Sequence, residues 1–181
     1  MRAGHLLEVD LDSGRVDERR YHRTVYAPDH SLRENDAAET LHGLLLESVR
    51  GNLISDAPVG LTLSGGFDTS TLLALVKELG VSREMHTFSL KINEASFDES
   101  RYQRIMVDFA RPIHHEIRVD PEDVVANIES SVAYMDEPSG NGGAVPMFLL
   151  SREAKKHVSV LFSGEGGDEI FNAYETHRAF K

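Results

Sequence analysis

Cysteine is absent from this chain of 181 residues. Its absence excludes disulfide bonds, thiolate nucleophiles and cysteine-based metal sites within the chain. The start of the chain also lacks a basic stretch followed by an apolar one, and no apolar run approaches the length that spans a bilayer. We therefore expect neither a secretory leader nor a membrane span, and the cytoplasm is the expected location.

Positive charge is scarce as well, since 19 Lys and Arg stand against 30 Asp and Glu, giving a formal net charge of -11. Nucleic-acid-binding surfaces need clustered Lys and Arg, so nucleic acid is not an expected partner. A phosphate-bearing ligand would need its charge offset locally, by Mg2+, backbone N–H groups and one or two well-placed cations. The length and the 40% hydrophobic content predict one globular domain with a sizeable core.

The order of apolar and polar residues predicts the elements. Two extended segments, 4–11 and 15–26, flank an Asp-Ser-Gly turn and predict a hairpin. Strands are then expected at 59–63, 85–90, 113–119 and 158–162, with helices at 34–50, 69–78, 98–109, 121–134 and 145–157 and a last helix running from about 168 toward the end. This alternation predicts an α/β fold with a parallel, doubly wound sheet.

Two of these helices carry apolar stripes that are expected to face the core. The stripe of the first helix consists of Leu41, Leu44, Leu45, Ser48 and Val49, and that of the last long helix of Met147, Phe148, Leu149 and Leu150. For His114 and His115, one side chain is expected to face the core and the other the solvent. A structural role is favoured over metal ligation because no third ligand is indicated by their spacing.

Residues 64–70 (SGGFDTS) lie between a predicted buried strand and a predicted helix. Gly65 and Gly66 allow a ligand to approach the backbone closely, and the N–H groups of a helix N-terminus favour a phosphate. Asp68 supplies a hard oxygen for phosphate-bound Mg2+. The motif is neither a Walker loop nor a Gly-x-Gly-x-x-Gly dinucleotide loop. The alternative is a plain turn whose glycines bend the chain while Asp68 or Thr69 caps the helix.

Residues 163–169 (SGEGGDE) repeat this arrangement of strand, glycine-rich turn and helix. Loops at the carboxyl ends of parallel strands converge on one edge of the sheet, so the two loops could share a crevice and Asp68 and Asp168 could hold one Mg2+. Acids in the first turn of a helix also stabilise it by about 0.3 to 1 kcal/mol, and that explanation is favoured for Glu169. It explains Glu165, which lies between glycines, less well.

The first loop resembles the pyrophosphate-binding loop of the N-type ATP pyrophosphatases, and the second, followed by Phe171 and Tyr174, resembles the asparagine synthetase branch of that superfamily. Residues 87–90, 98–100, 114–116 and 136–138 fall in the family's order, so the resemblance covers about residue 4 to the end. It implies an adenine nucleotide α-hydrolase-like fold that binds ATP. The implied reaction is ATP-dependent activation of a carboxylate, with L-aspartate favoured, as its adenylate with release of pyrophosphate, followed by attack of glutamine-derived ammonia.

The resemblance also implies roles for individual residues. Those implied to bind ATP, including its pyrophosphate, are Leu63, Ser64, Gly65, Gly66, Asp68, Thr69, Ser70, Leu90, Ser163 and Gly164. Asp68 and Asp168 are the implied metal ligands. Glu165 is the implied catalytic residue, acting at the acyl-adenylate as a base if a dry, acidic neighbourhood raised its pKa.

Two differences between this sequence and the family limit the activity that is expected of this chain. Residues 1–30 resemble only the end of a glutaminase domain and hold no cysteine, so ammonia is expected from a glutaminase domain or subunit elsewhere. Residues 31–181 correspond to the N-terminal part of the ATP-binding domain, and the family's later helices, which bring a lysine to the phosphates, are not in this sequence. The chain looks truncated in its last helix and could bind ATP without turnover.

Several alternatives stay open at this point. Relatives with the same loops include β-lactam synthetases and peptide-cyclising ligases, so the chain could belong to a related amide-forming ligase. Because the family's later helices are not in this sequence, the chain could also be a non-catalytic nucleotide-binding fragment. In a purely structural domain, both loops would be only turns. Homo-oligomerisation is open as well. Residues 136–143 read as a mobile connector whose acids and glycines could contact a substrate.

Overall fold

The computed structural model describes residues 1–92, 99–137, 140–171 and 173–174. The chain divides into two compact units, residues 1–39 and residues 40–181. The division falls inside helix α1 (Glu34–Asn52). Among the described residues, no helix combines the length and the apolar character needed to cross a membrane.

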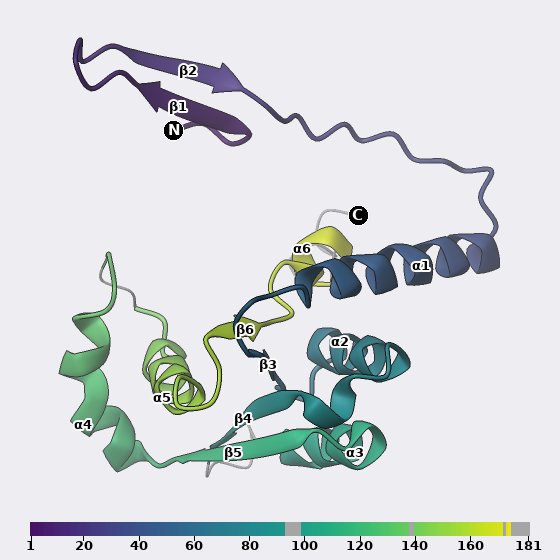
Figure 1. Ribbon diagram of the computed structural model, residues 1–181, viewed down its shortest axis with the longest axis vertical. Coiled ribbons are helices and arrows are strands. Elements are labelled where there is room, and N and C mark those ends of the chain that lie inside the picture. Colours follow the sequence, from purple (N-terminus) through teal and green to yellow (C-terminus); the bar gives the residue numbers. More distant parts are fainter. Residues whose placement is uncertain (93–98, 138–139, 172, 175–181) are drawn as a thin grey trace. The chain divides into compact units, whose positions relative to one another are not determined.

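The first unit contains the predicted hairpin, in which β1 (His5–Val9) pairs antiparallel with β2 (Val16–Arg20) (Figure 1). Asp10 shapes the turn, because its carboxylate accepts hydrogen bonds from the backbone N–H and the hydroxyl of Ser13, both at 2.7 Å. The second strand is shorter than predicted and ends at Arg20 instead of residue 26. The reason is that β1 begins only at residue 5, so later residues have no strand to pair with.

The second unit is built on a four-stranded sheet of β3 (Val59–Thr62), β4 (His86–Ile92), β5 (Ile113–Val119) and β6 (Val160–Phe162). The strand order is β5-β4-β3-β6 and all neighbours are parallel, which confirms the predicted fold class. The chain moves outward from β3 to β4 and β5 and then returns to the other side of β3. The order therefore reverses between β3 and β6, and in open α/β sheets ligands bind at such a switch point.

Helices alternate with the strands of this sheet along the chain. They are α1, α2 (Phe67–Glu78), α3 (Ser100–Ala110), α4 (Pro121–Val132), α5 (Ala144–Ala154) and α6 (Gly167–Phe171), with a short 3-10 turn, η1, at Ser82–Glu84 (Figure 1). One core cluster joins Leu61 of β3 to Val49 of α1 and Leu73 of α2. A second joins Phe88 of β4 to Leu150 of α5. Burial of apolar surface on both faces stabilises the sheet between two helical layers.

Several predicted positions in helices are corrected. On α1, Val49 is buried and Leu45 partly buried as predicted, but Leu41, Leu44 and Ser48 are exposed. Leu46 packs on the core instead of Leu44, since a helix of 3.6 residues per turn brings residues three and four before Val49 to the same face. On α5, Met147 is 44% exposed, whereas Leu149 and Leu150 are buried as predicted.

The last helix is also shorter than predicted. α6 ends at Phe171, and the N–H of Ala173 donates to the carbonyl of Asp168 at 3.0 Å, which closes a wider turn than an α-helix has. The remainder of that prediction falls on residue 172 and residues 175–181, outside the described residues. The helix predicted at 145–157 ends at Ala154, so His157 lies in the turn that follows it.

Candidate functional site

The first glycine loop connects β3 to α2, and its shape depends on Gly65. This residue has φ of 89°, which side chains rarely adopt, and a Cβ there would lie 3.0 Å from the backbone nitrogen of Gln103. The next residue, Gly66, is the N-cap of α2 and supplies no side-chain cap. The first-turn N–H groups of a helix have no partner inside the helix, so this glycine loop leaves the N-terminus of α2 open to a ligand.

Hydroxyl groups hold the loop together from within. The Ser64 hydroxyl accepts the N–H of Gly66 at 3.1 Å and lies 3.0 Å from the hydroxyl of Thr69. The Thr69 hydroxyl also accepts the backbone N–H of Ser64 at 3.2 Å, and this residue is only 8% exposed. These contacts fix the loop before any ligand arrives, which lowers the entropy cost of binding one.

The second glycine loop connects β6 to α6 and has the same backbone signature, because Gly166 also has φ of 89°. It packs directly against the first loop. A Cβ at Gly164 would lie 2.8 Å from the Cβ of Asp68, and a Cβ at Gly167 would lie 2.7 Å from the carboxyl carbon of Asp68. The Asp68 carboxylate therefore lies against the backbone of the second loop at Gly167, the residue that precedes Asp168 in the sequence.

A cleft of about 920 Å³ opens where the two loops meet. The predicted site residues on its wall are Leu63, Ser64, Gly66, Asp68, Thr69, Leu90, Ser163, Gly164, Glu165 and Asp168. Gly65 and Ser70 are not on the wall. Gly65 lies behind it against the start of α3, and Ser70 uses its N–H in the first helical bond, to the carbonyl of Gly66 at 3.1 Å.

The wall of this cleft is acidic. Its carboxylates are Asp68, Glu99, Glu165, Asp168 and Glu169, and no Lys or Arg is among the described residues that line it. The hydroxyl of Tyr174 donates to Glu169 at 2.9 Å, and this hydrogen bond is the main cause of the raised pKa of Tyr174. Oxygen ligands of this kind fit Mg2+, and a phosphate ligand would be repelled from such a wall without a cation to bridge the charges.

The sequence analysis missed Gln103, which is 5% exposed and lines the cleft. Its side-chain amide donates to the carbonyl of Ser64 at 3.0 Å and to the carbonyl of Leu90 at 3.2 Å. It thereby links α3 to the ends of β3 and β4. A signal was available, because Gln103 stands on the buried stripe of α3 with Met106, Val107 and Ala110, where a polar residue is unusual. Met147, predicted to belong to the core, also lines the cleft.

The prediction that one of His114 and His115 faces solvent is wrong, since both are partly buried between the helical layers. His114 lies 2.9 Å from the hydroxyl of Thr87 and 3.1 Å from that of Ser89, and burial lowers its pKa. These contacts agree with the structural role favoured for it. His115 points to the other face of the sheet, where two further histidines lie.

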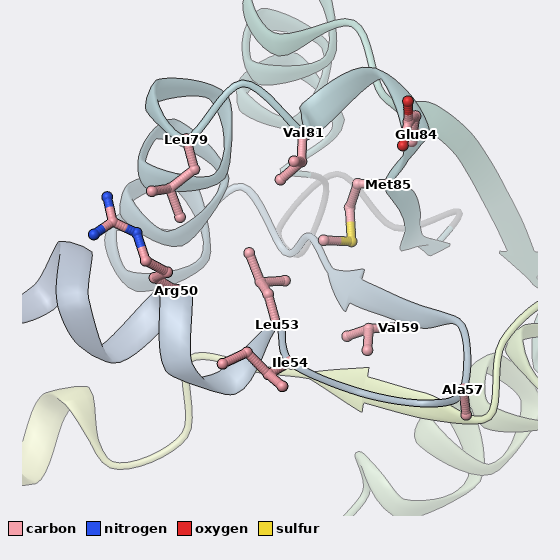
Figure 2. A pocket seen from close by; sticks show the side chains of 9 residues that line it. All are labelled: Arg50, Leu53, Ile54, Ala57, Val59, Leu79, Val81, Glu84 and Met85. Atoms are coloured by element: carbon pink, nitrogen blue, oxygen red, sulfur yellow. The ribbon is translucent and has the colours of Figure 1, made fainter.

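A separate, mostly apolar hollow of about 370 Å³ lies near the other end of β3 (Figure 2). It is lined by Arg50, Leu53, Ile54, Ala57, Val59, Leu79, Val81, Glu84 and Met85. Val59 begins β3 and Met85 precedes β4, so this hollow is at the strand ends opposite the glycine loops. With two charged residues among nine, it lacks the convergent polar groups of the cleft.

Comparison with known proteins agrees with this geometry. Residues 40–181 match the family described as asparagine synthase. The provisionally named glutamine-hydrolysing asparagine synthetase 2 of Methanocaldococcus jannaschii is 38% identical over 134 residues, covering 74% of this chain and 26% of that protein. Asparagine synthetase 1 of Bacillus subtilis, also glutamine-hydrolysing, is 32% identical over 152 residues, covering 80% and 23%.

Among solved structures, the NH3-dependent NAD synthetase of Campylobacter jejuni aligns with a TM-score of 0.49 and 13% identity, covering 79% of this chain and 61% of that one. This chain spans about a quarter of the length of the two synthetases named above. The family match nevertheless covers well over half of the chain, including the cleft and both glycine loops. This chain belongs to the asparagine synthase family.

Proposed function

We propose that this chain forms the ATP-binding part of an amide-forming ligase that activates a carboxylate, with L-aspartate favoured, as its adenylate. The observation that carries the proposal is the packing of two glycine loops against each other, through Asp68, at the switch point of a parallel sheet. The relatives named above support it, since both are glutamine-hydrolysing asparagine synthetases.

In this proposal the nucleotide lies along the cleft. Its pyrophosphate portion binds at the N-terminus of α2, where Ser64 and Gly66 lie and where helix N–H groups favour negative charge. The base packs against Leu63, which follows β3, and Leu90, which lies in β4, both on the cleft wall. Gly164 permits the close contact with Asp68 that keeps both loops in reach of one ligand.

Asp68 and Asp168 are the proposed ligands of Mg2+. The fit rests on their oxygen donors and on the acidic wall around them. When bound, Mg2+ would offset the charge that develops on the departing pyrophosphate. The chain's own part is to hold the Asp68 carboxylate in place against the backbone of Gly167, where a side chain would collide with it.

The proposed reaction has two steps. A carboxylate oxygen of the acceptor attacks the α-phosphorus, the bond from that phosphorus to the bridging oxygen of the β-phosphate breaks, and pyrophosphate leaves. The nitrogen of ammonia, released from glutamine by a glutaminase domain or subunit, then attacks the acyl carbon and AMP leaves. Glu165, exposed on the cleft wall, would accept the proton that ammonia loses. Alignment of the reacting groups supplies much of such catalysis.

Calorimetric titration with ATP and Mg2+ tests the binding part of this proposal. We expect Asp68→Ala to weaken binding at least tenfold, because it removes a metal ligand and the contact between the loops. Asp56→Ala is the matched control, since Asp56 is exposed and absent from the cleft wall. Chelation of Mg2+ should weaken binding to the unchanged chain as Asp68→Ala does. Equal affinities for the unchanged chain and Asp68→Ala would contradict the proposed site.

A second candidate is a non-catalytic nucleotide-binding module, which is favoured by the lack of Lys and Arg among the described lining residues. Exchange of labelled pyrophosphate into ATP separates the two. Exchange that depends on aspartate supports the ligase, and exchange only with another carboxylate supports a related amide-forming ligase. Binding of ATP without exchange for any carboxylate supports the module.

A further inference from the structure

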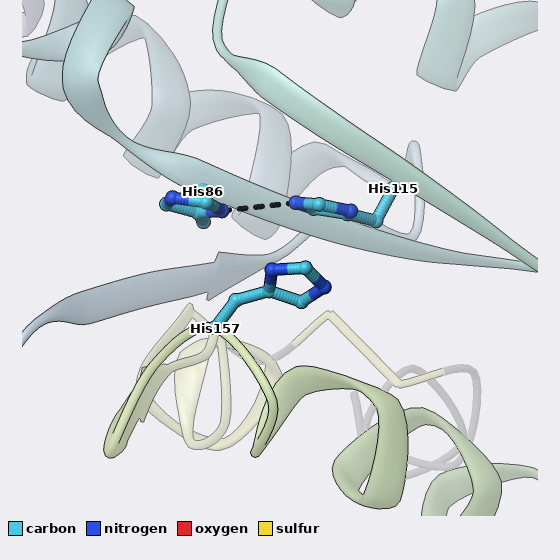
Figure 3. Close-up of side chains that lie close together, drawn as sticks. All are labelled: His86, His115 and His157. Carbon is cyan, nitrogen blue, oxygen red and sulfur yellow. Dashed lines mark hydrogen bonds between the residues drawn. The ribbon is translucent and has the colours of Figure 1, made fainter.

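Three histidines from separate parts of the second unit meet on one face of the sheet (Figure 3). His86 begins β4, His115 lies in β5, and His157 lies in the turn after α5. Each offers a ring nitrogen, and the three nitrogen atoms lie within 4.8 Å of one another. The spacing of histidines along the chain gave no sign of this group, because strand pairing and the packing of α5 bring it together.

Packing holds the three rings in place. The ring of His115 contacts those of both Phe88 and His157, with centroid distances of 4.8 Å and 4.2 Å. The nitrogen Nδ1 of His86 lies 2.9 Å from Nε2 of His115 in a hydrogen bond. The planes of these two rings are nearly parallel, with an interplanar angle of 7°. Phe88 is fully buried, so it forms a rigid base for the cluster.

We propose that His86, His115 and His157 bind one Zn2+ ion, at a site separate from the nucleotide cleft. In tetrahedral zinc sites the Zn–N distance is about 2.0 to 2.1 Å, which places neighbouring ligand atoms about 3.3 Å apart. The nitrogen atoms of His86 and His115 lie 2.9 Å apart in a hydrogen bond, and Zn2+ would replace the proton between them. Rotation of His157, whose side chain is 32% exposed at the surface, brings the third nitrogen in.

The surroundings fit a neutral imidazole ligand set. Burial is the main cause of the lowered pKa of His115, and the charges of His157 and His86 lower it further. Metal binding requires a ring nitrogen that carries no proton. Glu153 lies beside the cluster, with Oε1 at 3.8 Å from Nε2 of His157, and can orient that ring as carboxylates do around zinc-bound histidines.

This site differs from the proposed Mg2+ site in chemistry and place. Its donors are nitrogen atoms, which suit Zn2+, whereas the cleft offers carboxylate oxygens, which suit Mg2+. None of the three histidines lines the cleft, although Phe88, which packs on the ring of His115, does line it. A bound Zn2+ would fasten the turn after α5 to β4 and β5 and would not depend on nucleotide.

Titration of the 181-residue chain with Zn2+ alone, after treatment with a chelator, tests this inference. We expect one tight site, weakened at least tenfold by His157→Asn and by His115→Gln. His30→Asn is the control, since His30 is exposed and outside the cluster. The unchanged chain should also melt at a higher temperature with Zn2+ than without it, and His157→Asn should lose that shift.

Co2+ supplies a readout that does not require a folded variant. Bound to the unchanged chain, it should show the strong visible absorption of four-coordinate Co2+, and one equivalent of Zn2+ should abolish the absorption. Equal Zn2+ affinity in the unchanged chain and a folded His157→Asn chain would overturn the inference. So would a six-coordinate Co2+ spectrum. Saturation with Mg2+ alone should leave the Zn2+ stoichiometry unchanged, and competition by Mg2+ would place Zn2+ in the cleft instead.

Discussion

At the scale of single residues, two glycines give the cleft its form. Gly65 and Gly166 share φ of 89°, and each lies in the loop between a strand and a helix, Gly65 two residues before α2 and Gly166 one residue before α6. Each loop turns sharply enough to direct the start of a helix back toward the strand ends. Gly65 has a further constraint, because the start of α3 lies against it.

Substitution of Gly65 by alanine separates these two constraints. Gly80 is the matched control, since its φ is +81° but nothing lies within 4 Å of a Cβ there. Gly80→Ala should cost about 1 to 2 kcal/mol of unfolding free energy through backbone strain alone. Gly65→Ala should cost about 1 to 3 kcal/mol more, because its Cβ meets backbone atoms of Gln103 and Glu99. Urea unfolding followed by circular dichroism measures both, and equal losses would show that the contact with α3 is unimportant.

At the scale of elements, Gln103 joins three of them, since its amide on α3 bonds the carbonyls that follow β3 and lie near the end of β4. Gln103→Met keeps the size of the side chain and removes both donors. Two inward-facing carbonyls then lose a partner, and we expect a loss of about 1 to 3 kcal/mol in unfolding free energy. Affinity for ATP with Mg2+ should fall as well, because the carbonyl of Ser64 loses the hydrogen bond that holds the first glycine loop to α3.

Arg104→Met is the control for this substitution, because Arg104 is the next residue on the same helix and is exposed. It should leave both stability and nucleotide affinity nearly unchanged. If Gln103→Met behaved like Arg104→Met in urea unfolding and in calorimetry, α3 would have no part in holding the first loop.

How far the sequence predicts these elements depends on how local each signal is. Glycine loops between strands and helices are local, so residues 64–70 and 163–169 were identified, and the parallel order brought them together. Gln103 was missed because its partners are carbonyls set by the packing of α3, and His157 because it meets His86 and His115 only through tertiary structure. Leu44 was misassigned because its spacing from Leu41 and Ser48 also fits a helical stripe, and only the burial of Val49 in the tertiary structure selects the stripe that contains Leu46.

At the scale of the whole molecule, the two units differ in what stabilises them. The second unit buries residues on both faces of its sheet, with Leu61, Leu73 and Phe88 fully buried. In the first unit, every residue of β2 is exposed, and β1 has only His5 and Leu6 partly buried. A two-stranded hairpin without such a core is at best marginally stable in water. The exposed ion pair of Arg2 with Glu18 adds little to that, because water and salt screen it.

Hydrogen exchange measured by mass spectrometry should therefore separate the two units. Amides of β1 and β2 should exchange at least about a hundredfold faster than those of β3 and β4, a difference of about 2.7 kcal/mol in opening free energy. ATP with Mg2+ should slow exchange at the loops after β3 and β6 and leave the hairpin unchanged, because the proposed ligand residues all lie in the second unit. Hairpin amides as protected as those of β3 would mean that the hairpin is covered, by another part of this chain or by a second copy, and exchange at several protein concentrations would distinguish these.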